Sequence, residues 1–163
     1  QEIGEFSVPR KDGGHEAAWN TDGEIIRRRP LPTSENWQAR PPFDDPSFPG
    51  VYNYIKNNSD EFITSLGYSR EDGAYRITAR NNDQIAVFCH GGFGLTWIAH
   101  LLDLPLPLVW SGMFIAPSSV TTILFDERTE THAVPRCIAL GDTSHLYNAN
   151  LPIQPSGIVA NFI

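Results

Sequence analysis

The short stretch His90-Gly91-Gly92-Phe93-Gly94 combines residue types that could bind an anion. The imidazole of a histidine donates hydrogen bonds, and glycines, which lack a Cβ, let backbone N–H groups come close to a bound group. If a helix begins here, its first N–H groups have no partner within the helix, and the helix dipole is positive at this end. We therefore expect phosphate or sulfate to bind at His90 and at the three residues that follow it.

Two elements have to position this stretch. Residues 85–89 form an unbroken apolar run, which is typical of a strand buried on both faces. After the glycines, Leu95, Ile98, Ala99 and Leu102 have the i, i+3, i+4, i+7 spacing of one helix face. The sequence therefore predicts a strand, a glycine turn and a helix, with His90 at the C-terminal tip of the strand.

The rest of the chain predicts further regular elements. Residues 47–66 have a helical pattern that ends at Gly67, and a small hairpin is expected within 70–80. Residues 119–126 and 132–140 read as two strands of a second hairpin. The expected inward positions of the long helix are Val51, Ile55, Phe62 and Leu66.

Residues 11–50 are rich in glycine, proline and charge, so they cannot form a regular helix or a central strand. They also carry Trp19 and Trp37, so we expect an ordered excursion that caps the site as a lid and influences substrate choice. The run Arg27-Arg28-Arg29 has two interpretations. It is either a solvated charged segment or a cationic rim that meets a phosphorylated substrate.

Composition limits the possible functions. The chain has 163 residues, enough for a single domain over 1–163, and its net charge of −7 argues against a nucleic-acid partner. No apolar run approaches about 20 residues, so no membrane span is expected. Cys89 and Cys137 lie in apolar runs, which predicts buried, reduced thiols. The chain begins at Gln1 rather than Met, so a missing signal peptide is uninformative, and a cytoplasmic location is the default expectation.

Several kinds of site are disfavoured by missing motifs. The sequence has no G-x-S-x-G, no H-E-x-x-H and no C-x-x-C, so a hydrolase elbow and a zinc site have little support. A dinucleotide turn needs G-x-G-x-x-G, and Trp97 occupies the third glycine position. A nucleotide-binding domain therefore remains a weaker alternative.

Three segments carry a family resemblance, and in chain order they are VFCHGGFGLTWIAHLLDLP, SSVTTILFDE and LGDTSHL. They resemble the second-histidine segment, the following strand and the late loop of small phosphatases in the histidine phosphatase (phosphoglycerate mutase-like) superfamily. The resemblance covers roughly residues 84–146. Glu2, in QEIGEF, resembles the family's glutamate after the third strand over a shorter match.

The resemblance implies a fold and a chemistry. The fold would be a three-layer α/β/α sandwich with a mixed, mostly parallel sheet. His90 would stabilise the phosphoryl group together with the N–H groups of Gly91 and Gly92, and Glu2 would be the general acid. The reaction would be hydrolysis of a small-molecule phosphomonoester through a phosphohistidine, and the family needs neither metal nor cofactor.

The family's Arg-His-Gly motif, which supplies the nucleophilic histidine, is missing from residues 1–163. We therefore expect this chain to be the C-terminal part of the domain, incomplete at its N-terminus and inactive alone. Its missing partner would be an N-terminal segment of two βα units of roughly 30 residues each. Two alternatives remain open, namely a non-catalytic module that binds phosphate or a phospholigand, and mutase-type phosphotransfer.

Overall fold

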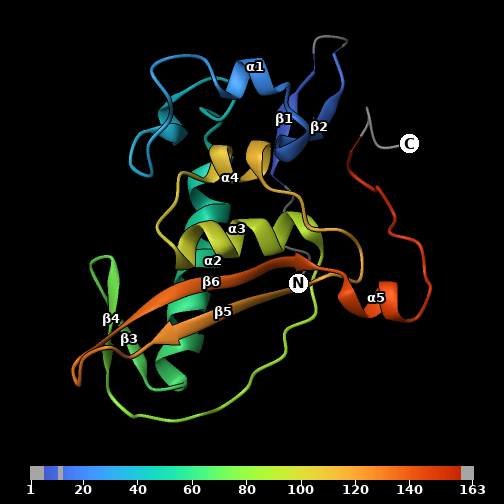
Figure 1. Ribbon diagram of the computed structural model, residues 1–163. Coiled ribbons are helices and arrows are strands. Elements are labelled where there is room, and N and C mark those ends of the chain that lie inside the picture. The colour runs from blue at the N-terminus through green and yellow to red at the C-terminus, as the bar shows by residue number, and fades with distance from the viewer. Residues whose placement is uncertain (1–5, 11–12, 159–163) are drawn as a thin grey trace.

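All strand pairing in the described part of the chain is antiparallel. The computed structural model describes residues 6–10 and 13–158 (Figure 1). A small sheet pairs β1 (Ser7–Pro9) with β2 (His15–Ala17). The larger sheet has the order β3-β4-β6-β5, made of β3 (Tyr68–Glu71), β4 (Ala74–Ile77), β5 (Val120–Asp126) and β6 (His132–Asp142). The expected three-layer sandwich with a mostly parallel sheet is therefore wrong.

The expected strand at residues 85–89 is the physical origin of this error. The segment has no regular secondary structure and pairs with no described strand. Its side chains are exposed, with Ile85 51% and Phe88 96% accessible. A parallel strand needs a neighbour that bonds its backbone, whereas an apolar run in the sequence shows only that burial is favourable. The hairpins formed because their partner strands are adjacent in sequence.

The two longest helices agree with the sequence. They are α2 (Ser47–Ser65) and α3 (Gly91–Leu101). Gly67, with a φ of +95°, follows α2 as expected for a glycine that ends a helix. The predicted inward face of α2 was partly wrong, because Phe62 is 37% exposed while Ser59 is buried. Ser59 is tolerated inside because its Oγ accepts the Trp97 indole N–H at 2.7 Å.

The shorter helices lie in segments with many prolines or polar residues. They are α1 (Gly23–Ile26), α4 (Leu106–Gly112) and α5 (Ser144–Asn148), with 3₁₀ turns η1 (Ala18–Asn20) and η2 (Trp37–Ala39). Pro105 and Pro107 sit at the start of α4, where a proline costs no helical hydrogen bond.

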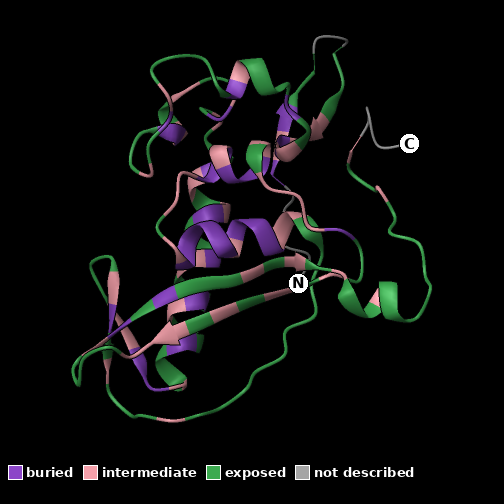
Figure 2. Ribbon diagram, viewed as in Figure 1, coloured by how far each residue is buried: buried purple, intermediate pink, exposed green. Residues whose placement is uncertain are grey.

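Helices α2 and α3 cover one face of the larger sheet, and two cores lie on either side of them (Figure 1). The core against the sheet includes Tyr75 and Leu101. The other core joins the helices to residues 13–50 of the excursion, which pack against the body as expected. Buried residues are concentrated in the helical layer (Figure 2). The opposite face of the sheet exposes the apolar side chains of Val120, Leu124, Val134, Ile138 and Leu140.

Two smaller expectations can also be compared with the structure. Both cysteines are free, but Cys89 and Cys137 are exposed rather than buried. Their apolar neighbours face outward as well, because the segment and the strand that carry them each lack cover on one side. Within the described residues, no helix has the length and apolar character needed to cross a membrane.

Candidate functional site

His90 is the residue that precedes α3. Its backbone is extended (φ −85°, ψ 157°), and its carbonyl accepts the N–H of Gly94 at 2.9 Å, which closes the first turn of the helix. The N–H groups of Gly91, Gly92 and Phe93 belong to that first turn, where α-helical geometry provides no acceptor four residues earlier. The side chain of His90 is exposed. The predicted combination of imidazole and helix N-terminus is therefore present.

Trp19 lies directly over the start of α3. A Cβ built on Gly92 would be 2.7 Å from Cη2 of Trp19, which is closer than real Cβ contacts allow. Gly94 is similarly confined, since its Cβ would lie 3.1 Å from Cδ1 of Ile115. Glycine at position 92 is therefore needed for the indole from η1 to pack on this turn. The excursion 11–50 thus reaches the predicted site through Trp19.

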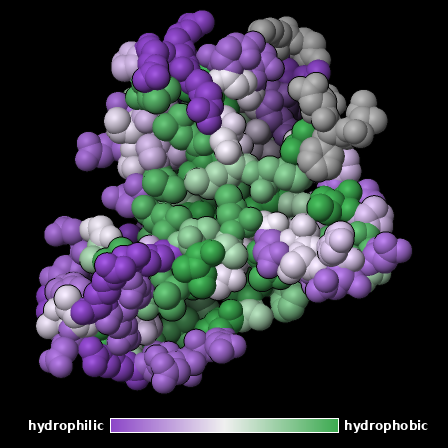
Figure 3. All heavy atoms as spheres, viewed as in Figure 1, coloured by the Kyte–Doolittle hydropathy of each residue, from purple (hydrophilic) through white to green (hydrophobic). Residues whose placement is uncertain are grey.

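His90 stands at the rim of a cavity of about 1350 Å³. Its floor is the apolar side of α3, including Leu95 and Ile98, and its two walls are residues 81–90 and strand β5. This volume exceeds the roughly 300–1,000 Å³ usual for small-molecule pockets. Hydrophobic residues gather over the middle of this side of the molecule, where β5, β6 and α3 lie (Figure 3).

The other predicted site residues are not gathered at His90. Glu2 lies outside the described residues. The guanidinium of Arg27 lies against Gly112 at the end of α4, with Nη2 2.6 Å from the position a Cβ would take there. Neither Arg27 nor Arg28 lines the cavity. Phe93 packs on Trp97 with ring centroids 6.0 Å apart, also outside the cavity lining.

The remaining histidines lie elsewhere in the fold. His15 is in β2 and His145 is exposed in α5. His132 pairs with Glu71, with 2.9 Å between Nε2 and Oε2. Trp37, which was expected to influence substrate choice, is 1% exposed and belongs to the core. Trp19 is therefore the tryptophan of the excursion that lines the cavity with His90.

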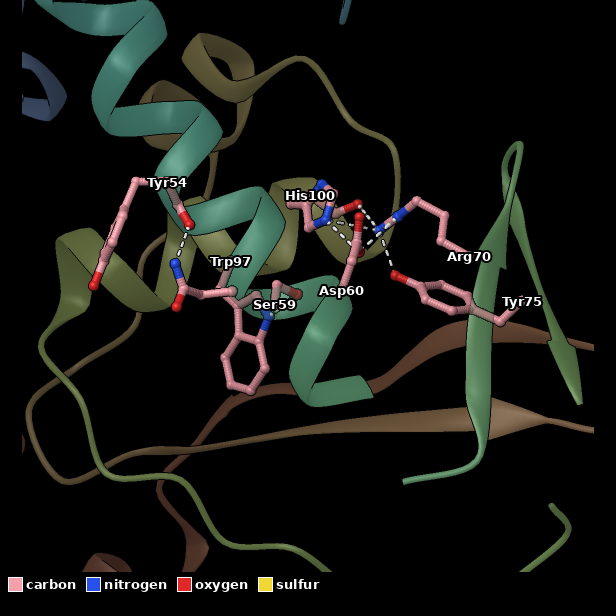
Figure 4. Close-up of polar contacts among 8 residues, drawn as sticks. Tyr54, Ser59, Asp60, Arg70, Tyr75, Trp97 and His100 are labelled. Atoms are coloured by element: carbon pink, nitrogen blue, oxygen red, sulfur yellow. Dashed lines mark hydrogen bonds and ion pairs between the residues drawn. The ribbon is translucent and has the colours of Figure 1, made fainter. Parts of the chain in front are cut away.

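A second polar cluster joins α2, α3 and the β3–β4 hairpin (Figure 4). Oδ1 of Asp60 lies 2.8 Å from Nε2 of His100 and 2.9 Å from Nε of Arg70. Nη2 of Arg70 also donates to the His100 carbonyl at 3.0 Å and to the Tyr75 hydroxyl. Sequence spacing could not reveal this cluster, because its members come from four different elements.

The cluster is suited to holding elements together rather than to chemistry. His100 is 6% exposed, and none of the four side chains lines the cavity. Nε2 of His100 lies between the carboxylate of Asp60, which can only accept, and Nη2 of Arg70 at 3.1 Å, which can only donate. Burial lowers the pKa of His100, although the hydrogen bond to Asp60 acts in the opposite direction. The neutral ring is therefore the form that the fold favours.

We expect this buried histidine to make the fold less stable at mildly acidic pH. Its folded pKa lies below the ordinary value of 6.5, so the unfolded chain binds more protons as pH falls. The stabilisation is complete above pH 6.5 and is lost as pH falls from there toward the folded pKa. The charged groups that act on the ring are Asp60, Arg70 and Lys56. Urea unfolding between pH 5 and 8, wild type against His100→Gln, measures the effect.

The variant should show a shallower dependence on pH than the wild type in this range. One proton limits the difference in slope to about 1.4 kcal/mol per pH unit. His145→Gln, a change at an exposed histidine, should reproduce the wild-type profile. Parallel profiles for wild type and His100→Gln would contradict the assignment of the neutral ring to the folded state.

Comparison of the chain with family models, with curated proteins and with solved structures finds no match. The resemblance to histidine phosphatases therefore stays a prediction from the residues themselves.

Proposed function

We propose that the start of α3 binds the phosphoryl group of a phosphomonoester, and that this site belongs to a phosphatase acting through a phosphohistidine. The observation that carries the proposal is the exposed imidazole of His90 next to the first N–H groups of an 11-residue helix. These donors and the positive end of the helix dipole lie at the same end of α3, where they could bind an anion. Phosphoryl transfer depends largely on such positioned donors.

Trp19 supports the same proposal. Its ring packs on Gly92 and lines the cavity at the end where His90 lies. An aromatic ring beside the donors shields a bound phosphate from water, which strengthens the hydrogen bonds around it. The excursion 11–50 would therefore act on substrate through this residue. Arg27 and Arg28 lie outside the cavity lining and are not needed for the proposed site.

The nucleophile of the proposed reaction would come from polypeptide other than residues 1–163. In the described chain, His15, His100, His132 and His145 are placed on other elements. Residues 1–163 alone should thus bind phosphate without releasing it from an ester. The placement of the other histidines away from His90 favours a second candidate function for residues 1–163 alone, namely a non-catalytic module that binds a phospholigand.

The test of binding is a titration of the ¹⁵N-labelled chain with inorganic phosphate, followed by NMR. The amide signals of Gly91 and Gly92 should shift, and His90→Ala should weaken binding about tenfold, because a hydrogen bond to a charged group is lost. His145→Ala removes an equally exposed imidazole elsewhere and should leave the affinity unchanged. Equal phosphate affinity in wild type and His90→Ala would remove His90 from the site.

The test of catalysis uses para-nitrophenyl phosphate. Residues 1–163 should not hydrolyse it. In a protein that also supplies the nucleophilic histidine, His90→Ala should lower kcat by about 10²–10³, the usual cost of losing one transition-state donor. Trapping of a phosphohistidine from labelled substrate would distinguish the phosphatase from the binding module. Full hydrolysis by the His90→Ala protein would contradict the proposed role.

A further inference from the structure

Two backbone edges face the same cavity without strand partners among the described residues. Strand β5 is at the end of the sheet order β3-β4-β6-β5, so its second edge is unpaired within the described sheet. Residues 84–89 have no regular secondary structure and belong to no described strand. Both segments line the cavity, and α3 forms its floor. Natural sheets seldom leave a long apolar edge open to solvent, because such an edge pairs with other chains.

The side chains around this groove are apolar and accessible. Ile85 is 51% exposed, Val87 47% and Leu124 46%. The outer face of the β5–β6 hairpin continues the apolar surface with Val134 and Ile138, which are 48% and 60% exposed. An apolar surface of this extent on a folded domain marks a place where another element binds. An occupant of the groove would contact α3 with one face and extend the outer apolar surface with the other.

The groove has an acidic end. Among the described lining residues, the carboxylates are Asp83 and Glu127, and no Lys or Arg lines the cavity. Oε1 of Glu127 accepts the Tyr68 hydroxyl at 2.7 Å. Burial, the bond to Glu127 and the charges of Glu127 and Asp83 raise the pKa of Tyr68 to about 12. Arg80 pairs with Glu127 at 3.1 Å, so Asp83 leaves this end negative.

We propose that the groove between residues 84–89 and β5 binds an extended strand of a partner polypeptide. The strand would be uncharged and apolar on both faces, and would carry a Lys or Arg at the end beside Asp83. Its backbone would bond the open edge of β5, as in other complexes in which a peptide adds a strand to a sheet. A seven-residue occupant matching β5 would span about 23 Å, which suits a groove larger than a small-molecule pocket.

A second copy of this chain fits the groove less well than a separate strand. In a second copy one edge of β5 is already paired with β6. Its free edge could bond β5 of the first copy, but the strand could not at the same time bond residues 84–89. Its sequence VTTILFD also carries an acidic residue at one end and no basic one. The inference concerns the apolar groove and does not depend on phosphate binding at His90.

The experiment measures binding of two fluorescein-labelled peptides to residues 1–163 by fluorescence anisotropy. Their sequences are Lys-Lys-Val-Ile-Val-Ile-Val-Gly-Ser and the reverse order, so that either strand direction is represented. One of them should bind saturably and protect residues 84–89 and 120–126 from hydrogen exchange. The same peptide with alternate amides N-methylated keeps its side chains but loses the N–H groups along one edge. When these are the N–H groups that face β5, the peptide should bind at least about tenfold more weakly.

Variants of the groove locate the binding. Val87→Lys puts a charge in the groove, and Leu124→Lys puts one on the outer face of β5 directly beside the added strand. Each change should weaken binding at least about tenfold. Tyr147→Lys, at a side chain 86% exposed outside the cavity lining, should bind as the wild type does. Asp83→Lys should weaken binding of the Lys-Lys peptide and favour a Glu-Glu counterpart. This charge exchange still tests the proposal if a Lys variant in the groove fails to fold.

Several results would overturn the proposal. They are no saturable binding of either peptide, equal binding of the N-methylated peptide, and an affinity unchanged by Val87→Lys and Leu124→Lys. Sedimentation velocity on the chain without peptide adds another. A dimer that Leu124→Lys dissociates, together with no peptide binding, would assign the groove to a second copy of the chain.

Discussion

Replacing Gly67 by alanine is expected to lower the free energy of unfolding by about 3 kcal/mol or more, because two costs coincide at this residue. The φ of +95° is unfavourable for any residue with a Cβ, which costs about 1–2 kcal/mol. The added Cβ would also lie 2.2 Å from the carbonyl oxygen of Ala79. Since that neighbour is backbone, relief requires the β3–β4 hairpin to move away from α2.

The movement would break the hydrogen bonds that hold the start of residues 81–90, the segment that lines one side of the cavity. The carbonyl of Gly67 accepts the N–H groups of Thr78 at 2.8 Å and Ala79 at 3.2 Å. Asn81 then donates its side-chain amide to the carbonyl of Leu66 at 2.7 Å. Residues 81–90 leave the hairpin from this point, so Gly67 helps to fix the start of the segment that leads to His90. Urea denaturation followed by circular dichroism measures the loss.

Two other glycines distinguish the cost of the positive φ from the cost of the clash with Ala79. Gly13 has a φ of +84°, but a Cβ there would meet nothing within 4 Å, so Gly13→Ala should cost about 1–2 kcal/mol. Gly50 lies in α2 with open space around it, and Gly50→Ala should stabilise the chain by about 0.5–1 kcal/mol. A Gly67→Ala loss no larger than that of Gly13→Ala would show that Ala79 moves freely and would contradict the argument.

The elements that the sequence predicted well are those decided by nearby residues. The i, i+3, i+4 spacing of Leu95, Ile98 and Ala99 requires no knowledge of the rest of the fold, and α3 formed as expected. The β5–β6 hairpin joins strands that are neighbours in the chain. Gly67 ended α2 because the chain reverses there with a positive φ. In each case the local sequence pattern favours the same secondary structure that the complete fold contains.

The failures involve partners that are distant in the chain. Residues 85–89 satisfy the pattern of a buried strand, yet burial depends on which strands lie beside them. The packing of Trp19 on Gly92 and the bond between Asp60 and His100 likewise join residues far apart in sequence. At the candidate site, the sequence therefore predicted the local unit of His90 and glycines, but not Trp19 over it. The sequence also could not show that the side chain of Arg27 packs against the end of α4 and not at the candidate site.

Replacing Trp37 by alanine is expected to cost about 3–5 kcal/mol of unfolding free energy, the usual range for deleting a large buried aromatic side chain. The side chain is 1% exposed. Its ring contacts four others, with centroid distances of 5.3 Å to Tyr52, 5.9 Å to Phe43 and 6.2 Å to both Phe48 and Trp110. These partners belong to α2, α4 and the excursion 11–50, so one residue joins all three.

The effect should extend to the candidate site through Trp110. The ring of Trp110 contacts Trp37 on one side and Trp19 on the other, with centroids 6.2 Å apart in each case. A cavity at position 37 lets Trp110 relax, and Trp19 loses its support over Gly92. Hydrogen exchange should accelerate in the excursion and at the first hydrogen-bonded amides of α3, which begin at Gly94. The β5–β6 hairpin, which packs on the separate core around Tyr75, should be less affected.

The matched control is Tyr54→Ala, which removes an aromatic ring from α2 that is 47% exposed. Because this ring is largely hydrated, its loss should cost less than about 1 kcal/mol. Trp37→Phe keeps an aromatic ring in place and should retain most of the stability. If Trp37→Ala lowered stability without faster exchange at residues 94–97, the tryptophans would not couple the excursion to α3. Trp19 would then have to be held over Gly92 by its contact with the helix alone.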